Sequence, residues 1–346
     1  MAETVRVVVD AMGGDNAPQE IVKGAVEAVN MSKDIRVILT GQQEAVDAEL
    51  AKYTYDSEQI TTVDCPEVIE MAESPVAAIR TKKQSSLVVG MRMIRNGEAD
   101  AIVSAGNTGA ILVGGQTIVG RIKGVERTPT APLIPTEQGI AILIDSGANV
   151  DPKPSYLVQY ALMGSIYMEY VVGIQNPRVA LLNIGAEEEK GNALVKETYP
   201  LLQELDGINF VGNIEARDIP HGLADVIVCD AFSGNIVLKL YEGAADTIIK
   251  AIKDGMMTNL RSKLGGALVK PALKETLKAF DTSEYGGAPL LGCQGLVVKT
   301  HGSATANDIK NSVLQCVTFK QQGINDKIRE HITQSDKQEE KENIDP

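Results

Sequence analysis

Short apolar runs alternate with longer amphipathic stretches along most of the chain. The apolar runs have the length of buried β-strands and cover residues 5–9, 35–39, 59–63, 101–103, 140–144, 179–182, 208–211 and 226–228. Helical periodicity predicts helices over residues 19–31, 86–96, 108–121, 155–172, 193–205, 235–253 and 305–332. Because strand and helix alternate in this way in βαβ units, the sequence predicts an α/β fold with a doubly wound, mostly parallel sheet.

The chain shows no linker or shift in composition that would mark a domain boundary. We therefore expect residues 1–332 to form a single α/β unit. The last segment, "TQSDKQEEKENIDP" at 333–346, is polar and highly charged. Such a segment cannot bury enough apolar surface to fold, so it is predicted to be a disordered tail.

Composition and charge exclude several classes of protein. A formal net charge of −13 excludes nucleic acid as a main partner, because phosphate backbones are bound by a basic face. The four cysteines are far apart without a CxxC motif, as in cytosolic proteins with reduced thiols. The N-terminus "MAETVRVVVD" has no signal-peptide pattern, and no run reaches the ~20 apolar residues of a spanning helix. These features predict a cytoplasmic protein that can still touch a membrane surface.

Five of the predicted strands run into loops of similar composition. Each loop begins with Asp, Asn or Ser, continues with small residues and leads toward a helix. The loops are "DAMGGDN" (10–16), "SAGNTGA" (104–110), "DSGAN" (145–149), "NIGAEEEKGN" (183–192) and "DAFSGN" (230–235). Such residues are ordinary turn and cap residues when they occur in one loop. Since the carboxyl ends of parallel strands share one edge, where ligands bind and helix N-termini attract anions, five such loops predict an anion site.

The sequence lacks the motifs of nucleotide, metal and nucleophile sites. No GxGxxG follows a strand and no "GK" pair occurs, which excludes a Walker A loop. His221, His301 and His331 are isolated, so a zinc site is not expected. No GxSxG elbow is present either. The sequence thus predicts a site that needs no metal, no cofactor and no protein nucleophile.

Several motifs in fixed order carry a family resemblance. "VVVDAMGGDNAP" (7–18), "SAGNTGA", "NIGAEEEKGN", "DAFSGN" and "SEYGGAPLLG" (283–292) resemble the bacterial phosphate acyltransferases, the phosphate:acyl-acyl-carrier-protein enzymes of phospholipid synthesis. The likeness extends from about residue 5 to residue 332. It implies a fold like that of isocitrate dehydrogenase and phosphotransacetylase, and a homodimer that associates peripherally with membranes. It also implies transfer of a fatty acyl group from acyl-carrier protein to inorganic phosphate, with acyl phosphate as the product.

This chemistry suits an anion site of the predicted kind. Phosphate is already nucleophilic, and a thioester is a reactive acyl donor. The enzyme must hold the two together and stabilise a developing oxyanion, which is a task of positioning and electrostatics.

Lys190 and Asn235 are the predicted catalytic residues. Lys190, in "EEEKGN", stands just before a predicted helix, where a cation can neutralise phosphate or the oxyanion. The alternative is a solvated lysine that balances the three preceding glutamates, and the resemblance favours the catalytic role. Asn235 opens the helix after "DAFSG", so its amide can donate to the carbonyl or to phosphate, or it can cap the helix.

A further set of loop residues is predicted to bind substrate. The set consists of Gly13, Gly14, Asn107, Thr108, Asn183, Ser85 and Ser86. Ser85 and Ser86 are equally suited to capping the helix that follows them. Asp10 and Asp15 are expected to shape their loop, since carboxylates repel phosphate. His301 is a possible general acid for the leaving thiolate, but such a histidine is more often structural, so it stays outside the catalytic set.

Residues 250–280 form a basic island in an acidic protein. Seven lysines and arginines against two acidic residues give the island a net charge of +5. Leu260, Leu264 and Leu268 fall at helical spacing and form an apolar stripe. Gly265, Gly266 and Pro271 suggest two short helices in a protruding hairpin. Basic flanks with an apolar face are typical of a helix on anionic lipid, and docking of acidic acyl-carrier protein or a dimer contact remain alternatives.

Three other functions are compatible with parts of this pattern. The nearest is a phosphotransacetylase-like transfer from acyl-CoA to phosphate, because both donors present a phosphopantetheine arm. A fold-related 2-hydroxy-acid dehydrogenase needs an aspartate cluster for its metal, and no clear cluster is visible. A non-catalytic membrane scaffold would use the basic island and leave the five loops unexplained.

Overall fold

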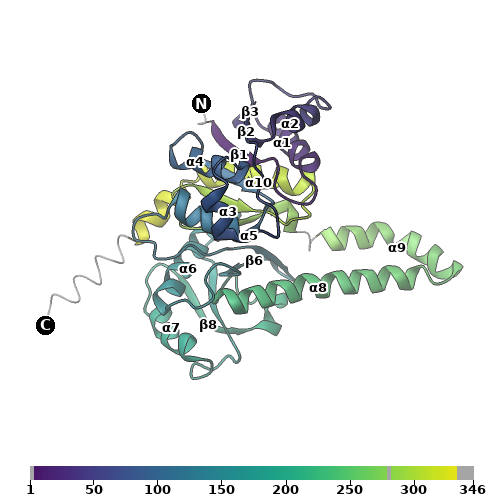
Figure 1. Ribbon diagram of the computed structural model, residues 1–346. Helices are drawn as coiled ribbons and strands as arrows, with labels where there is room; N and C mark the ends of the chain where they lie inside the picture. The colour runs from purple at the N-terminus through teal and green to yellow at the C-terminus, as the bar shows by residue number, and fades with distance from the viewer. Residues whose placement is uncertain (1–3, 279–281, 333–346) are drawn as a thin grey trace. The chain divides into compact units, whose positions relative to one another are not determined.

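The chain folds into two compact units, each with its own sheet. The structure, a computed structural model, describes residues 4–278 and 282–332 (Figure 1). The first unit takes the described residues within Met1–Pro132, Leu162–Asn176 and Ser283–Pro346, and the second takes Leu133–Ala161 and Pro177–Thr282. The predicted tail at 333–346 lies outside the described residues. That residues 1–332 act as one catalytic unit stays a prediction.

The first unit is built on a six-stranded sheet with the order β10-β11-β4-β1-β2-β3. Its strands are β1 (Val5–Asp10), β2 (Ile35–Gly41), β3 (Ile60–Asp64), β4 (Ala101–Ser104), β10 (Ala288–Leu290) and β11 (Leu296–Lys299). All neighbours are parallel except β10, which runs antiparallel to β11 at the edge. The helices are α1 (Gln19–Met31), α2 (Gln43–Leu50), α3 (Pro75–Thr81), α4 (Ser86–Arg95), α5 (Thr108–Gly114) and α10 (Ala306–Gln321). A π-helical turn, Gly115–Val119, extends α5.

The central strand β1 shows why the sheet is covered on both faces. Val7, Val8 and Val9 are all fully buried, which is typical of parallel strands with helices on either side. Val8 belongs to the core cluster that includes residues of α4 and α5. The helices α1 and α10 pack against each other and against β1. Since successive side chains of a strand point to opposite faces, this arrangement is the doubly wound one that the sequence predicts.

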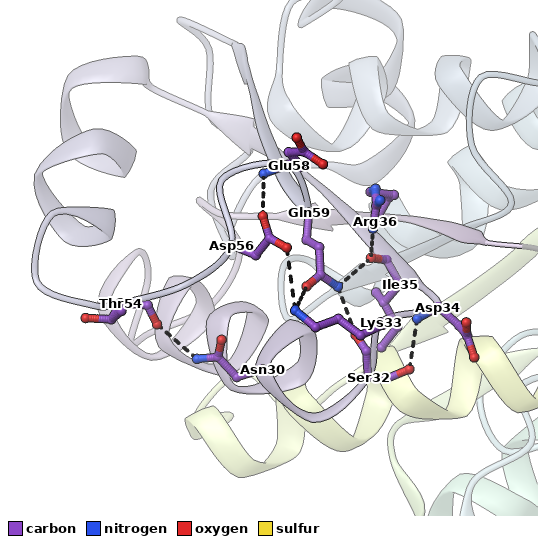
Figure 2. A network of polar contacts seen from close by, with 10 residues as sticks. All are labelled: Asn30, Ser32, Lys33, Asp34, Ile35, Arg36, Thr54, Asp56, Glu58 and Gln59. Carbon is purple, nitrogen blue, oxygen red and sulfur yellow. Dashed lines mark hydrogen bonds and ion pairs between the residues drawn. The ribbon is translucent and has the colours of Figure 1, made fainter.

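A polar network fixes the amino-terminal edge of this sheet, away from the loops that follow the strands (Figure 2). The buried side chain of Gln59 donates through Nε2 to the carbonyl oxygens of Ser32 (2.9 Å) and Ile35 (3.1 Å). Lys33 donates to Gln59 Oε1 (3.4 Å) and pairs with Asp56 (3.5 Å). These contacts tie the start of β2 to the segment before β3.

The second unit is built on a five-stranded sheet with the order β5-β6-β9-β7-β8. Its strands are β5 (Leu133–Thr136), β6 (Gly139–Ile144), β7 (Arg178–Asn183), β8 (Asn209–Glu215) and β9 (Val226–Val228), and only β5 is antiparallel to its neighbour. Its helices are α7 (Ala193–Gln203), α8 (Ala231–Met256) and α9 (Leu260–Lys278), with a 3₁₀ turn at Ala216–His221. The helix α6 (Pro154–Tyr167), followed by a π-helical turn at Met168–Val172, leads from the second unit into the first. A 3₁₀ turn at Thr282–Tyr285 leads back into the first unit.

The two long helices at the end of the second unit form an antiparallel pair. The 26 residues of α8 lead from the sheet, and the 19 residues of α9 fold back along it (Figure 1). The prediction of breaks at Gly265, Gly266 and Pro271 that divide residues 250–280 into two short helices is wrong, because α9 is continuous through all three residues. Gly266 faces Met256 of α8, so its lack of a side chain lets the two helices approach. Packing against α8 therefore outweighs the tendency of glycine and proline to break a helix.

Two further features of the described residues bear on the sequence predictions. The four cysteines are free and buried, as expected of reduced thiols. Within residues 4–278 and 282–332, no helix combines the length and the apolar character needed to cross a bilayer.

Candidate functional site

The five glycine- and asparagine-rich loops follow two sheets and not one. The loops at 10–16 and 104–110 follow the adjacent strands β1 and β4 of the first unit. The loops at 145–149, 183–192 and 230–235 follow β6, β7 and β9, which are neighbours in the second unit. The prediction of a single shared edge is therefore wrong, since it assumed one sheet. Each unit still carries its own group of adjoining loops.

Asp10 is the centre of the loop group in the first unit. Its buried carboxylate accepts a hydrogen bond from Ser104 Oγ (2.7 Å) and one from the backbone N–H of Met12 (3.4 Å). Burial raises the pKa of Asp10, while hydrogen bonds from Ser86, Ser104 and Met12 oppose that rise. The residue thus shapes the loop, as the sequence predicts.

The two glycines of this loop lie close to side-chain and backbone atoms of neighbouring segments. A Cβ atom on Gly13 would lie 2.6 Å from Asp10 Oδ2 and 2.8 Å from the backbone nitrogen of Gly106. Gly14 has a φ of +102°, a conformation that side chains disfavour. These contacts account for both glycines within the protein, and their contact with substrate stays a prediction.

A third segment, which follows β11, joins this group; the sequence analysis considered His301 within it but predicted neither β11 nor a role for the rest of the segment. The backbone N–H of Asp15 donates to the carbonyl oxygen of Gly302 (2.7 Å), in the segment that follows β11. Thr300, at the start of that segment, is buried, and its hydroxyl has no hydrogen-bond partner among residues 4–278 and 282–332. The signal was the apolar run "LVVK" before it, which is strand β11.

Asn107 holds the N-terminus of α5. Its Oδ1 accepts from the backbone N–H of Ala110 (3.0 Å), which is a helix cap. Its amide nitrogen donates to the carbonyl oxygens of Glu70 (3.2 Å), Met71 (3.0 Å) and Glu73 (3.0 Å). A contact of Asn107 with substrate would therefore have to replace bonds that are already made.

The other predicted substrate-binding residues of the first unit differ in their exposure and in their hydrogen bonds. Thr108, the first residue of α5, is exposed. Ser85 caps α4 by accepting from the N–H of Val88 (3.4 Å), and its hydroxyl donates to the carbonyl oxygen of Lys82 (2.8 Å). Ser86 is buried and hydrogen-bonded to Asp10. The capping alternative thus holds for Ser85, and phosphate contact by either serine stays a prediction.

In the second unit, Asp145 organises the loop after β6. Its buried carboxylate accepts from the backbone N–H groups of Gly147 (3.2 Å), Ala148 (3.1 Å) and Asn149 (2.9 Å). The thiol of Cys229 contacts the carbonyl oxygen of Asp145 at 3.2 Å. Burial, and then the negative charges of Asp145 and Asp230, raise the pKa of Cys229. Cys229 is therefore a neutral thiol at physiological pH and a poor nucleophile.

Asn183 and Lys190 are joined across the loop after β7. Asn183 is buried, and its amide donates to the carbonyl oxygen of Lys190 (3.1 Å) while its Oδ1 accepts from the N–H of Ile184 (2.8 Å). The side chain of Lys190 is exposed, and its ammonium forms no hydrogen bond or ion pair within the described part of the chain. The three preceding glutamates thus do not hold Lys190 in an ion pair.

Asn235 also keeps its polar group unengaged. The helix α8 begins at Ala231 and is capped by Asp230, whose Oδ1 accepts from the N–H of Ser233 (2.8 Å). The predicted helix start at 235 is wrong, and so is the capping alternative for Asn235, because Asp230 does the capping. Asn235 is half-buried in the helix, and its side-chain amide has no partner among the described residues.

The last features to consider are the contacts of His301 and the arrangement of potential metal ligands. His301 is exposed, and its Nδ1 lies 2.7 Å from Ser303 Oγ. Among residues 4–278 and 282–332, no group of three or more His, Cys, Asp or Glu side chains is arranged to hold a metal ion.

Comparison with known proteins supplies the family. A family model described as "Fatty acid synthesis protein" matches residues 5–327. The phosphate acyltransferases of Clostridium novyi and Alkaliphilus oremlandii are each 50% identical over 330 residues, which cover 95% of this chain and 99% and 97% of theirs. A phosphotransacetylase from Streptococcus pyogenes matches 91% of this chain and 93% of its own with a TM-score of 0.62 and 18% identity, which shows the fold alone. These matches confirm the predicted α/β fold, and the chain belongs to the phosphate acyltransferase family of transferase enzymes.

Proposed function

We propose that the protein transfers a fatty acyl group from acyl-carrier protein to inorganic phosphate, forming acyl phosphate for phospholipid synthesis. One observation carries this proposal. Lys190 and Asn235 lie on segments that follow the adjacent strands β7 and β9, and both keep their side-chain donors unengaged within the described residues. An ammonium and an amide donor at one sheet edge suit a reaction between a dianion and a carbonyl group.

The two donors have separate tasks in this reaction. The ammonium of Lys190 neutralises phosphate, so that a phosphate oxygen approaches the thioester carbonyl carbon. The amide of Asn235 donates to the carbonyl oxygen as negative charge develops on it. When the intermediate collapses, the carbon–sulfur bond breaks and the thiolate leaves and takes a proton from solvent. Phosphate is itself the nucleophile, which agrees with the raised pKa of the buried Cys229.

The backbone supports an anion at the same place. The helix α7 begins at Ala193, directly after the Lys190 loop, and Asn192 caps it by accepting from the N–H of Val195 (3.0 Å). The first N–H groups of a helix lack partners within the helix and carry partial positive charge. Lys190 and the N-terminus of α7 would therefore both attract an anion bound at this loop.

Incubating the protein with long-chain acyl-carrier protein and inorganic phosphate should yield acyl phosphate without an added metal or nucleotide. Mass spectrometry of the product measures this directly. Sulfate in place of phosphate serves as the control, because it has similar shape and charge but is a poor nucleophile. A product that forms equally with sulfate, or activity that is lost in EDTA and restored by a divalent ion, would contradict the proposed reaction.

The same assay separates the two alternative functions. Acyl-CoA shares the phosphopantetheine arm, and the fold likeness to a phosphotransacetylase keeps that donor as the second candidate. We expect a higher kcat/KM with acyl-carrier protein than with acyl-CoA of the same chain length. A protein that turns over neither donor would be a non-catalytic scaffold.

The proposal extends to the partners and location of the enzyme. We propose a cytoplasmic homodimer that associates peripherally with anionic membranes through α9. Leu260, Leu264 and Leu268 are 80%, 69% and 83% exposed and lie along one side of this helix. Full insertion of each leucine would contribute about 1.5–3 kcal/mol. Each basic residue near an anionic surface would add about 1 kcal/mol, so binding should be reversible and sensitive to salt.

Replacing Leu260 and Leu264 by glutamate should release the protein from anionic vesicles. The double variant Leu260→Glu/Leu264→Glu loses apolar contact and adds negative charge at the lipid surface. Co-sedimentation with phosphatidylglycerol vesicles measures the bound fraction, and turnover of a water-soluble acyl donor shows that the variant is folded. If the double variant sediments with vesicles as the parent does, α9 is not the membrane contact.

A further inference from the structure

The helices α3 and α4 of the first unit, with the short segment between them, form a basic surface on an acidic protein. Residues 74–95 carry five lysines and arginines and no acidic residue, whereas the whole chain has a net charge of −13. The five are Arg80, Lys82, Lys83, Arg92 and Arg95. A local field of this sign attracts an acidic partner, although the protein as a whole repels one.

Three of these cations have no carboxylate partner within the described residues. Lys82 forms an ion pair with Glu73 and is thereby neutralised. Arg80 is exposed, and its guanidinium forms no hydrogen bond or ion pair with any residue that the structure describes. Lys83 donates to a backbone carbonyl oxygen of α3 (3.2 Å), and Arg92 donates to the carbonyl oxygen of Lys83 (3.0 Å). Arg80, Lys83 and Arg92, here called the basic patch, therefore lie close together and keep their positive charge.

The basic patch borders the loop group of the first unit. Ser86, three residues after Lys83, is hydrogen-bonded to Asp10 at the centre of that group. The amide of Asn107 donates to three carbonyl oxygens of the segment that leads into α3, and α3 packs against α5 (Figure 1). A partner bound at the basic patch would therefore lie beside the loops that are predicted to bind substrate.

Two exposed apolar side chains accompany the basic patch. Val76 is 62% exposed and precedes Arg80 by four residues, so the two side chains share one face of α3. Met71 is 46% exposed, and its Cε would lie 3.2 Å from a Cβ atom on Gly302, in the segment that follows β11. Apolar contact area thus lies both next to the cations and toward the loop group.

A protein helix that carries carboxylates and apolar side chains matches this surface in charge and in character. We propose that α3 and α4 dock the acyl-carrier protein, with its acidic side chains on Arg80, Lys83 and Arg92 and its apolar side chains on Val76 and Met71. The proposal rests on the proposed function, because that reaction makes the carrier protein the acyl donor. A carrier protein docked here places the start of its phosphopantetheine arm beside the loop group of the first unit.

An anionic membrane is the other partner that a basic surface attracts. A helix that lies in a membrane interface needs a broad apolar face. Val76 is the only large apolar side chain that is exposed on α3 and α4, both of which the structure describes in full. The hydrogen bonds of Lys83 and Arg92 to backbone carbonyl oxygens also hold the cations in place. Cations in fixed positions suit the fixed carboxylates of a folded protein.

Reversing two charges of the basic patch should weaken the binding of the carrier protein. Calorimetry with the full-length protein and holo-acyl-carrier protein, which carries the arm but no acyl group, measures affinity without turnover. The double variant Arg80→Glu/Lys83→Glu should raise Kd at least about tenfold, because opposite charges become like charges. It should also make the binding less sensitive to salt.

Lys33→Glu is the matched control. Lys33 lies at the amino-terminal edge of the same sheet (Figure 2), and its side chain is 80% exposed. Its ion pair with Asp56 is a surface pair, which contributes little to stability. This variant should bind the carrier protein within about twofold of the parent.

Kinetics with two donors separate docking from catalysis. With acyl-carrier protein as donor, Arg80→Glu/Lys83→Glu should raise KM at least about tenfold and leave kcat within about twofold. With octanoyl-pantetheine, a neutral donor that has the reactive thioester but no acidic protein, kcat/KM should stay within about twofold of the parent. Equal losses with both donors would overturn the proposal, because the two side chains would then support catalysis or folding.

The remaining outcomes distinguish this proposal from its alternatives. Equal affinity of the parent and the double variant for holo-acyl-carrier protein overturns it. Loss of binding to phosphatidylglycerol vesicles with unchanged affinity for the carrier protein would assign the basic patch to the membrane. A parent that binds the carrier protein more tightly than the double variant but forms no acyl phosphate would overturn the proposed function and keep the docking surface.

Discussion

Lys190→Ala should lower kcat by about 100-fold or more while the protein stays folded, the scale expected when a key electrostatic contact in the transition state is lost. The ammonium of Lys190 has no partner within the described residues, so its removal breaks no structural bond of the side chain. The loop itself is held by the Asn183 amide on the Lys190 carbonyl oxygen, which alanine keeps. Steady-state rates with varied phosphate measure the effect.

Lys196→Ala is the matched control for this variant. Lys196 is an exposed lysine of α7, the helix that follows the Lys190 loop, and its loss changes the net charge equally. Its turnover should stay within about twofold of the parent, because a surface charge at a distance is screened. Asn235→Ala should also lower kcat strongly, and circular dichroism checks the fold of all three variants. Near-normal turnover of a folded Lys190→Ala would remove Lys190 from the mechanism.

Gly234→Ala should destabilise the second unit by about 3 kcal/mol and abolish activity. A Cβ atom at Gly234 would overlap the carbonyl oxygen of Asp145 and lie 2.8 Å from Cys229 Sγ. Asp145 and Cys229 are both buried and cannot easily give way, so the first turn of α8 has to move. Overpacking of this kind costs about 1–3 kcal/mol in cores, and a clash with backbone lies at the upper end. Chemical denaturation of the parent and the variant measures the difference.

A second glycine of α8 provides a control variant that should stabilise the protein instead of destabilising it. Gly243 lies within α8, and a Cβ atom there would meet nothing within 4 Å. Gly243→Ala should therefore stabilise the protein by about 0.5–1 kcal/mol, because alanine loses less backbone entropy than glycine in a helix. If both variants unfold like the parent, the close contact at Gly234 does not set the position of α8.

The sequence predicts the interior strands well because their pattern is local. Parallel strands covered on both faces are continuous apolar runs, and β1, with its three buried valines, is the clearest case. The missed edge strands β5 and β10 each contain a proline, Pro135 and Pro289. Proline within an apolar run argues against a strand unless the strand lies at an edge, and which strand is an edge is known only from the fold.

In the candidate site, too, local features could be predicted from the sequence, whereas contacts between distant segments could not. The prediction of Lys190 and Asn235 as catalytic residues rests on local features, a cation and an amide in loops of small residues, and for Lys190 also on the family resemblance. The sequence did not predict that the side chains of Asn107 and Ser85 are hydrogen-bonded within the protein. Their partners include backbone carbonyl groups, which come close to these side chains only when the chain folds. Thr300 was missed because β11, the strand that precedes it, was not among the predicted strands.

The sequence by itself determined the α/β class, the interior strands, the small-residue loops that follow them and the family resemblance, because these depend on patterns within short stretches. Only the tertiary structure decided that the five loops belong to two sheets, since strand order depends on pairing between distant segments. It also decided that Asp230 caps α8 and leaves Asn235 unengaged. The continuity of α9 through Pro271 was decided in the same way, because packing between helices can outweigh the conformational preference of single residues.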